Sequence, residues 1–231
     1  MELTRETAST REQAESYRIM CGFCARLFEE SPEPEFIRGL VENRHLLLEA
    51  PFADVAGQAA RDLFDVLDAV AGASSEELDA FITEVRRDYT YLFYMVGSSH
   101  TSPYESVYRT DDRTLFGPTT LEVRSCYRAQ GVQTTEEGSR PDDHIASELS
   151  FLEFLCEKPD ESGVIQSFLS DHVLVFAPTY LKNVQTRAQE PFYRNVAAIA
   201  EALLDAMAED YGAHPAEIID PQAYLLSGNT I

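Results

Sequence analysis

Apolar side chains recur at the spacing of an α-helix along most of this chain, and this periodicity constrains the fold more than any other feature. Apolar stripes of this kind run between residues 52 and 71, between 78 and 93, and between 192 and 204. The clearest stripe, in the first 30 residues, consists of Ala14, Tyr17, Cys21, Cys24 and Phe28. No convincing alternation of period two and no Asn-Gly hairpin signal is present. The pattern therefore predicts an all-α protein of about seven to nine helices.

Capping residues and prolines divide the periodic stretches into separate helices. Ser31-Pro32 is expected to end the first helix and to begin the second, with Pro at its first position. Ser74–Glu77 fits a capping box, in which the two side chains bond each other's backbone N–H groups. Pro178 is expected to kink or divide the helical segment from about 162 to 188.

The longest break in the helical pattern runs from 97 to 117. A loop of this length within a compact domain is either functional or a hinge between two halves. It is rich in turn formers, yet it holds five large apolar residues: Tyr104, Val107, Tyr108, Leu115 and Phe116. We therefore expect the loop to be ordered and packed against a helix from 142 to 157. We interpret the chain as one helical domain over 1–231, with an N-terminal half (1–96), this loop, and a C-terminal half (118–231).

The stretch 140–148 begins that helix, and it is the strongest candidate for a functional site. Asp142 or Asp143 is expected to cap the first helical turn by accepting a hydrogen bond from a backbone N–H group. Helical spacing places His144 and Glu148 one turn apart, at the border of a buried face. Two interpretations follow. Either these residues are caps and core-edge residues, or Asp143 and His144 line a binding site at the mouth of the helix.

The charge balance disfavours nucleic acid as a partner. The net charge is −22, from 40 acidic and 18 basic residues, and such a chain repels phosphate backbones. The stretch from Glu136 to Glu161 contains nine acidic residues and only two basic ones. This run is either a solvated surface or a region that attracts a cationic peptide.

The sequence also predicts a cytoplasmic protein without stable membrane insertion. A membrane-spanning helix needs about 18 or more consecutive apolar residues, and the chain contains no such run. The polar N-terminal stretch has none of the apolar core of a secretion signal. Four cysteines without regular spacing are typical of a reducing compartment.

Three other kinds of site are disfavoured by their context. Cys21 and Cys24 match the spacing of a redox pair, but they lie in a helical stretch without a preceding strand, which favours core packing. Asp143, His144 and Glu148 could form a metal-dependent hydrolase, which is the alternative function, but no further ligand stands at motif spacing. No phosphate-binding glycine loop supports nucleotide binding. We expect no cofactor and no metal.

Several short motifs in the second half of the chain occur together. They are Pro103–Tyr108 (PYESVY), Leu115–Pro118 (LFGP), and Pro141 followed by Asp143–Ile145 (DHI), with Tyr127, Gly131 and His172 around them. In combination they resemble the TorD/DmsD family of molybdoenzyme-maturation chaperones, over roughly residues 88 to 205. The chain departs from the family pattern in having Arg140 where a Glu often precedes the Pro, and in having no Trp.

The resemblance implies a cytoplasmic, all-helical chaperone without catalytic activity. Such a protein binds the twin-arginine signal peptide and the apo-form of a molybdopterin-dependent oxidoreductase catalytic subunit until its cofactor is inserted. It would meet the twin-arginine translocase only indirectly. Carboxylates would accept the peptide's guanidinium groups, and aromatic side chains would contact its apolar part. The expected peptide-binding residues are Tyr104, Glu105, Ser106, Tyr108, Phe116, Pro141, Asp142, Asp143, His144 and Glu148.

Overall fold

The computed structural model describes residues 3–94, 101–109, 114–135, 140–158 and 161–216, and these are helical over most of their length. The described part contains no β-strand, only an isolated antiparallel bridge between Tyr104 and His144. The helices are α1 Leu3–Glu29, α2 Pro34–Glu42, α3 Phe52–Val55, α4 Gly57–Ala71, α5 Ser75–Phe93, α6 Ser106–Arg109, α7 Pro118–Ala129, α8 Ile145–Cys156, α9 Ser162–Phe168, α10 Leu174–Arg187 and α11 Pro191–Tyr211. A 3-10 helix spans Arg44–Leu48 and a π-helix spans Leu169–Val173. The predicted all-α class is confirmed.

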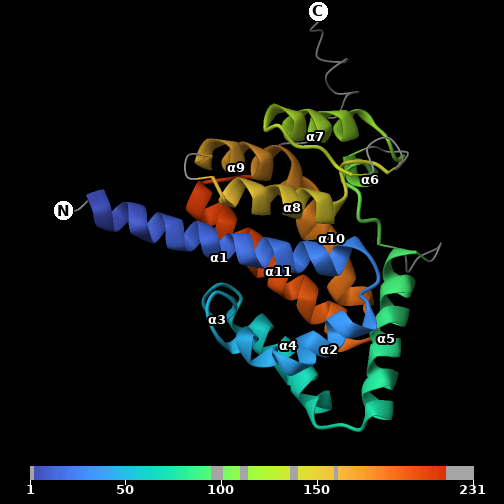
Figure 1. Ribbon diagram of the computed structural model, residues 1–231. Helices are drawn as coiled ribbons and strands as arrows, with labels where there is room; N and C mark the ends of the chain where they lie inside the picture. Colours follow the sequence, from blue (N-terminus) through green and yellow to red (C-terminus); the bar gives the residue numbers. More distant parts are fainter. Residues whose placement is uncertain (1–2, 95–100, 110–113, 136–139, 159–160, 217–231) are drawn as a thin grey trace, which may run out of the picture.

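Helix α1 lies at the centre of the packing. It packs along α8 on one side and against α11, which in turn contacts α10 and α4 (Figure 1). The hydrophobic core joins residues from both ends of the chain, among them Phe28, Leu92, Leu152, Phe176 and Tyr193. The division into halves at 97–117 stays a prediction.

Several helix boundaries differ from the predicted ones, and each difference has a local cause. The second helix begins at Pro34, with Glu33 as its N-cap, because a second proline follows Pro32 and takes the first helical position. The stretch 52–71 is split where Gly57 adopts a φ of +44°. The predicted number of helices was lower because such short segments merge with their neighbours in the apolar pattern. The capping box is confirmed: the Ser74 side chain accepts from the Glu77 N–H, and the Glu77 carboxylate accepts from the Ser74 N–H.

The segment from 162 to 188 is interrupted before Pro178, not at it. Helix α10 continues through Pro178, and the break is the π-helix Leu169–Val173, whose wider hydrogen-bond spacing accommodates one additional residue. Pro178 has no N–H to bond the carbonyl of Leu174, the residue that directly follows the π-helix. The irregular turn and the proline therefore occupy the same part of the segment.

The predicted packing of the central loop is confirmed for residues 101–109. The Glu105 N–H donates to the Asp143 carbonyl (2.9 Å), and the Ile145 N–H donates to the Pro103 carbonyl (2.8 Å), so the loop lies against the start of α8. The expected burial of its last apolar residues is wrong, because Leu115 and Phe116 are 45% and 54% exposed. Here the chain turns into α7 with Phe116 at a φ of +60°. Residues 97–100 and 110–113 of the predicted loop lie outside the described residues.

None of the helices described is long and apolar enough to cross a membrane.

Candidate functional site

His144, not an aspartate, caps the start of α8. Its Nδ1 accepts from the Ala146 N–H at 3.1 Å, so this nitrogen carries no proton in the cap. Burial and the positive charge of Arg140 hold the pKa of His144 well below its usual value, which keeps the ring neutral. The expectation that Asp142 or Asp143 would cap this helix is therefore wrong. Both carboxylates instead accept hydrogen bonds from α6 or α7, which lie far from them in the sequence.

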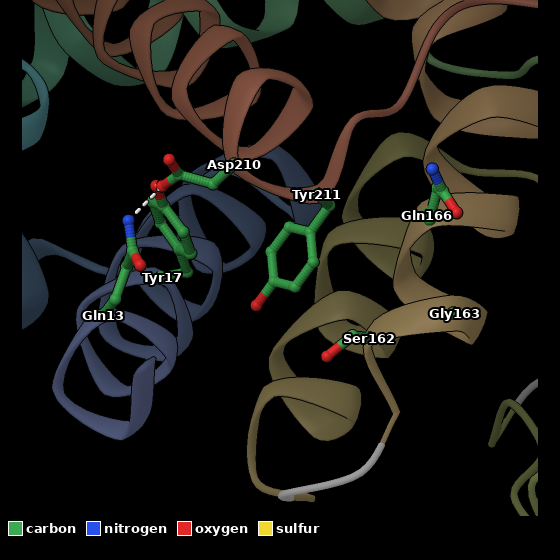
Figure 2. Close-up of a pocket in the computed structure, with 7 residues that line it drawn as sticks. All are labelled: Gln13, Tyr17, Ser162, Gly163, Gln166, Asp210 and Tyr211. Carbon is green, nitrogen blue, oxygen red and sulfur yellow. Dashed lines mark hydrogen bonds between the residues drawn. The ribbon is translucent and has the colours of Figure 1, made fainter. Parts of the chain in front are cut away.

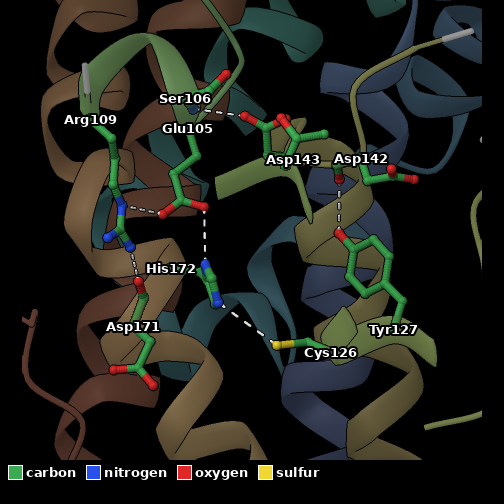
Figure 3. A network of polar contacts seen from close by, with 10 residues as sticks. Glu105, Ser106, Arg109, Cys126, Tyr127, Asp142, Asp143, Asp171 and His172 are labelled. Atoms are coloured by element: carbon green, nitrogen blue, oxygen red, sulfur yellow. Dashed lines mark hydrogen bonds and ion pairs between the residues drawn. The ribbon is translucent and has the colours of Figure 1, made fainter. Parts of the chain in front are cut away.

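Asp143 is fully buried and joins three segments of the chain. Its Oδ2 accepts from the Ser106 N–H (2.7 Å), and its Oδ1 accepts from the Thr120 hydroxyl (2.7 Å). The first bond, which Figure 3 shows, caps the short helix α6, and the second holds α7. The carboxylate therefore stabilises the arrangement of α6, α7 and α8.

Asp142 is also buried, and a guanidinium of the same chain already occupies it. Its Oδ2 lies 2.7 Å from both Nε and Nη2 of Arg124, and Thr134 donates to its Oδ1. The Tyr127 hydroxyl donates to the Asp142 carbonyl at 3.1 Å. An incoming arginine would have to displace Arg124 to reach this carboxylate.

Glu105 is the centre of a second buried set of polar contacts. Its Oε1 accepts from Arg109 Nε (2.7 Å), and its Oε2 lies 3.1 Å from His172 Nδ1 (Figure 3). The other ring nitrogen of His172 lies 3.7 Å from the sulfur of Cys126. Burial lowers the pKa of His172, but its hydrogen bonds with Cys126 and Glu105 outweigh this and raise it to about 9.

Glu148 lies in the same interior without a hydrogen-bond partner for either carboxyl oxygen among the described residues. Burial, together with the negative charges of Glu105 and Asp143, raises its pKa well above the usual value. Burial and these neighbouring charges therefore favour the neutral, protonated form of the carboxyl group over the carboxylate.

An open cavity of about 310 Å³ lies beside this buried interior. It is lined by residues from the C-terminal ends of α1 and α5, from the loop before α6, and from the start of α8: Glu29, Glu30, Tyr89, Phe93, Tyr94, Pro103, Tyr104, Arg140 and His144. The rings of Tyr104 and His144 meet edge to face, with their centroids 5.0 Å apart. Arg140 forms an ion pair with Glu29. The cavity combines acidic groups with aromatic walls.

Of the predicted peptide-binding residues, only Tyr104 and His144 line this cavity. Tyr108 donates to the Ser102 carbonyl at 2.9 Å and packs against Phe176. Phe116 is exposed before α7. The remaining predicted residues are buried and do not line the cavity: Glu105, Ser106, Pro141, Asp142, Asp143 and Glu148. The peptide-binding role of these residues stays a prediction.

Glu29, Glu30 and the aromatic residues at the end of α5 were not predicted as site residues from the sequence. The signal was an adjacent pair of acids at the end of the first periodic stretch. Nothing local to that pair indicated that it would face Arg140, 111 positions away.

A second, smaller cavity of about 230 Å³ lies between α1, α9 and α11. Tyr17 and Gln13 of α1 both donate to the Asp210 carboxylate, and Tyr211 lies between this group and Ser162 (Figure 2). Asp210 is exposed, so its hydrogen bonds are those of a solvated surface group.

The competing kinds of site find little structural support. In the part of the chain that the structure describes, no three His, Cys, Asp or Glu side chains come together as metal ligands, and Asp143 and His144 are used in capping. Cys21 and Cys24 are both buried in α1, so their predicted core packing is confirmed.

Comparison with known proteins places the chain in a family. The family model described as nitrate reductase delta subunit matches residues 49–182. The chain is 25% identical over 115 residues to the probable Tat proofreading chaperone DmsD of Haemophilus influenzae, covering 50% of this chain and 56% of that protein. It is 28% identical over 131 residues to the chaperone protein TorD of Vibrio cholerae, covering 52% and 59%. It is 28% identical over 129 residues to the chaperone protein YcdY of Escherichia coli, covering 54% and 64%.

These matches span less than two thirds of the length of each of the three relatives. The family match itself covers more than half of this chain. It includes the loop before α6, the start of α8 and the π-helix with His172, which are the segments that carried the resemblance in the sequence. The chain therefore belongs to the nitrate reductase delta subunit family and, within it, resembles the TorD and DmsD chaperones.

Proposed function

We propose that this protein is a maturation chaperone that binds the N-terminal leader of a molybdopterin-dependent oxidoreductase catalytic subunit before cofactor insertion and export. The observation that carries the proposal is the cavity between α1, α5 and α8, where two carboxylates lie beside aromatic walls. A twin-arginine leader joins a cationic segment to an apolar one. Its receptor therefore needs acceptors for guanidinium groups next to an apolar surface.

The acidic side of the cavity is available for exchange. Glu30 pairs with Arg26 at 2.9 Å, but both side chains are substantially exposed, and such pairs contribute little stability. Glu29 pairs with Arg140 at the cavity wall. A guanidinium from a leader can replace Arg26 without leaving a buried charge alone, and it would compete with the half-buried Arg140 for Glu29. The faces of Tyr94 and Tyr104 can add cation–π contacts to the same group.

The buried polar network supports this cavity from behind. Bonds from Glu105 N–H to the Asp143 carbonyl and from Ile145 N–H to the Pro103 carbonyl fix Tyr104 opposite His144. We therefore assign Asp143 a positioning role: it holds the cavity wall and does not itself contact the leader. This assignment explains why a motif of charged residues is buried in a protein that binds a cationic peptide.

The remaining parts of the proposal concern the whole protein. The client is an apo-oxidoreductase subunit held in the cytoplasm, and its translocation partner is met through the client alone. The chaperone contributes binding and protection, with no catalytic step and no cofactor of its own. The names of the relatives, a Tat proofreading chaperone and a chaperone protein TorD, support this assignment.

Calorimetry with synthetic leader peptides tests the proposal. The wild-type protein is titrated with a peptide that carries two arginines before an apolar segment, and with a peptide in which both arginines are glutamine. We expect the Arg→Gln peptide to bind roughly tenfold to a hundredfold more weakly, because each charge-assisted hydrogen bond contributes about 1.5–3 kcal/mol.

A protein variant then locates the site. Glu29→Gln with Glu30→Gln should reproduce the loss seen with the Arg→Gln peptide and should leave the melting temperature unchanged. The matched control is Glu42→Gln with Glu49→Gln, which removes two exposed carboxylates outside the cavity. Equal affinity for both peptides would refute recognition of the cationic segment. Equal loss in the two double variants would refute the cavity as its location.

A further inference from the structure

Three side chains from separate elements form a line behind the cavity: Cys126 of α7, His172 of the π-helix, and Glu105 before α6 (Figure 3). The Cys126 sulfur lies 3.7 Å from His172 Nε2, and His172 Nδ1 lies 3.1 Å from Glu105 Oε2. The leader-binding proposal uses none of this arrangement beyond the backbone of Glu105.

The order of these groups is that of an activated thiol nucleophile. A carboxylate that accepts from Nδ1–H fixes the orientation of the imidazole, and Nε2 then faces the nucleophile. From this position the Nε2–H of the protonated ring can donate a hydrogen bond to the sulfur and stabilise the thiolate. Glu105 binds Nδ1 of His172 and so holds the ring with its Nε2 directed at the sulfur of Cys126.

Cys126 differs from the other three cysteines in its surroundings. Cys21, Cys24 and Cys156 are buried, and burial raises the pKa of the Cys24 thiol to about 12 and that of Cys156 to about 12. These are the properties of inert structural thiols. Cys126 is only partly buried, and among the described residues it is the cysteine whose sulfur lies beside an imidazole nitrogen. A small reagent can reach it.

Two further observations set this cluster apart from ordinary core packing. Glu148 is fully buried with no hydrogen-bond partner for either oxygen among the described residues, and burial together with the charges of Glu105 and Asp143 raises its pKa. An unpaired carboxyl group in the interior needs an explanation beyond stability. In addition, His172 lies in a π-helix. This geometry is rare in proteins as a whole, but where it occurs it is often at a functional site.

We propose that Cys126 is a redox-modification site, whose thiol reacts with hydroperoxides under the influence of His172 and Glu105. In the reaction the sulfur attacks one peroxide oxygen, the S–O bond forms and the O–O bond breaks. The protonated His172 donates its Nε2–H to the sulfur and stabilises it as the thiolate. The proton released by the thiol passes through solvent to the departing hydroxide, which leaves as water. The sulfur is oxidised by two electrons to a sulfenic acid, and the peroxide is reduced by two electrons. This proposal stands independently of leader binding.

The test measures oxidation of each cysteine separately. The folded wild-type protein is treated with hydrogen peroxide, sulfenic acid is trapped with dimedone, and labelled peptides are quantified by mass spectrometry over time. The same measurement on the chain unfolded in urea gives the rate for Cys126 without its neighbours. We expect Cys126 to be labelled about tenfold faster in the folded protein, and the three buried cysteines to be labelled more slowly than in the unfolded chain. Labelling of Cys126 that is no faster in the folded protein would overturn the proposal.

A substitution assigns the effect to the imidazole. His172→Gln should bring the Cys126 rate down to that of the unfolded chain, whereas His45→Gln, which removes an exposed imidazole in the 3-10 helix, should not change it. An unchanged rate in a folded His172→Gln variant would overturn the role of His172. If this variant fails to fold, the comparison of folded and unfolded wild-type protein still decides the matter.

Discussion

The buried network and the open cavity share a wall, yet they use acidic residues in opposite ways. In the network, Asp142 and Asp143 are buried, and their oxygens accept bonds from Arg124, Thr120 and the Ser106 N–H. In the cavity, the side chains of Glu29 and Glu30 are 40% and 58% exposed, although Arg140, the partner of Glu29, is half-buried. The network therefore holds the structure, and the cavity carries the charge that a ligand can meet. Substitutions should separate these two roles.

The largest effect should come from the network. Asp143→Ala removes two hydrogen bonds to a buried carboxylate, and it leaves the Ser106 N–H and the Thr120 hydroxyl without their acceptor. We expect the free energy of unfolding to fall by about 3 kcal/mol or more. Urea denaturation measures it, with Glu42→Ala as an exposed control that should change stability by less than about 0.5 kcal/mol. If the Asp143→Ala variant has normal stability but binds no leader, Asp143 contacts the leader and does not hold the structure.

The second prediction concerns the pH dependence of stability. The pKa of Glu148 is raised in the folded protein, so between its ordinary value and the raised value the folded state holds a proton that the unfolded state has lost. Stability therefore falls as pH rises through that range, by up to about 1.4 kcal/mol per pH unit. Glu148→Gln removes this dependence. Its stability relative to the wild type should rise from pH 4.5 to pH 7, as measured by denaturation at each pH. A parallel pH profile for the two proteins would show that Glu148 is charged in the fold.

Arg140 offers a smaller test on the cavity side. Its guanidinium pairs with Glu29 in the place proposed for a leader arginine. Arg140→Gln should therefore tighten binding of a twin-arginine peptide by about 1 kcal/mol, or roughly fivefold. Calorimetry measures it, and Arg18→Gln, whose partner Glu15 lies outside the cavity, is the control. Weaker binding by Arg140→Gln would show that Arg140 contacts the leader directly.

Salt should produce the smallest effect and should distinguish the two regions without any substitution. Exposed charges are screened over about 8 Å at physiological ionic strength, whereas buried pairs are screened much less. Leader affinity should therefore decrease severalfold between 50 and 500 mM salt, while the melting temperature changes little. An affinity that is independent of salt would indicate a mainly apolar interaction with Tyr94, Tyr104 and their neighbours.

The fold was largely predictable from local patterns, and the site only in part. Apolar periodicity and the Ser74–Glu77 capping box are local, and both predicted real helices. The cap of α8 was not predictable, because Asp143 is drawn to the N-terminus of α6, which lies 37 residues earlier at Ser106. The acidic side of the cavity was also missed. Glu29 acquires its role only when α1 packs beside α8 and brings it to Arg140.

The π-helix at Leu169–Val173 has a consequence for deletion. A π-turn differs from an α-turn by one residue, and each residue of an α-helix advances about 100° around the axis. Removing Ser170 would allow α9 and α10 to continue as one regular helix, and it would swing the side chains on one side of the junction by about that angle relative to the other. His172 would then no longer face both Glu105 and Cys126. The additional residue in this turn thus sets the direction of one imidazole, and a chain shortened by one position could keep every helix while losing that alignment.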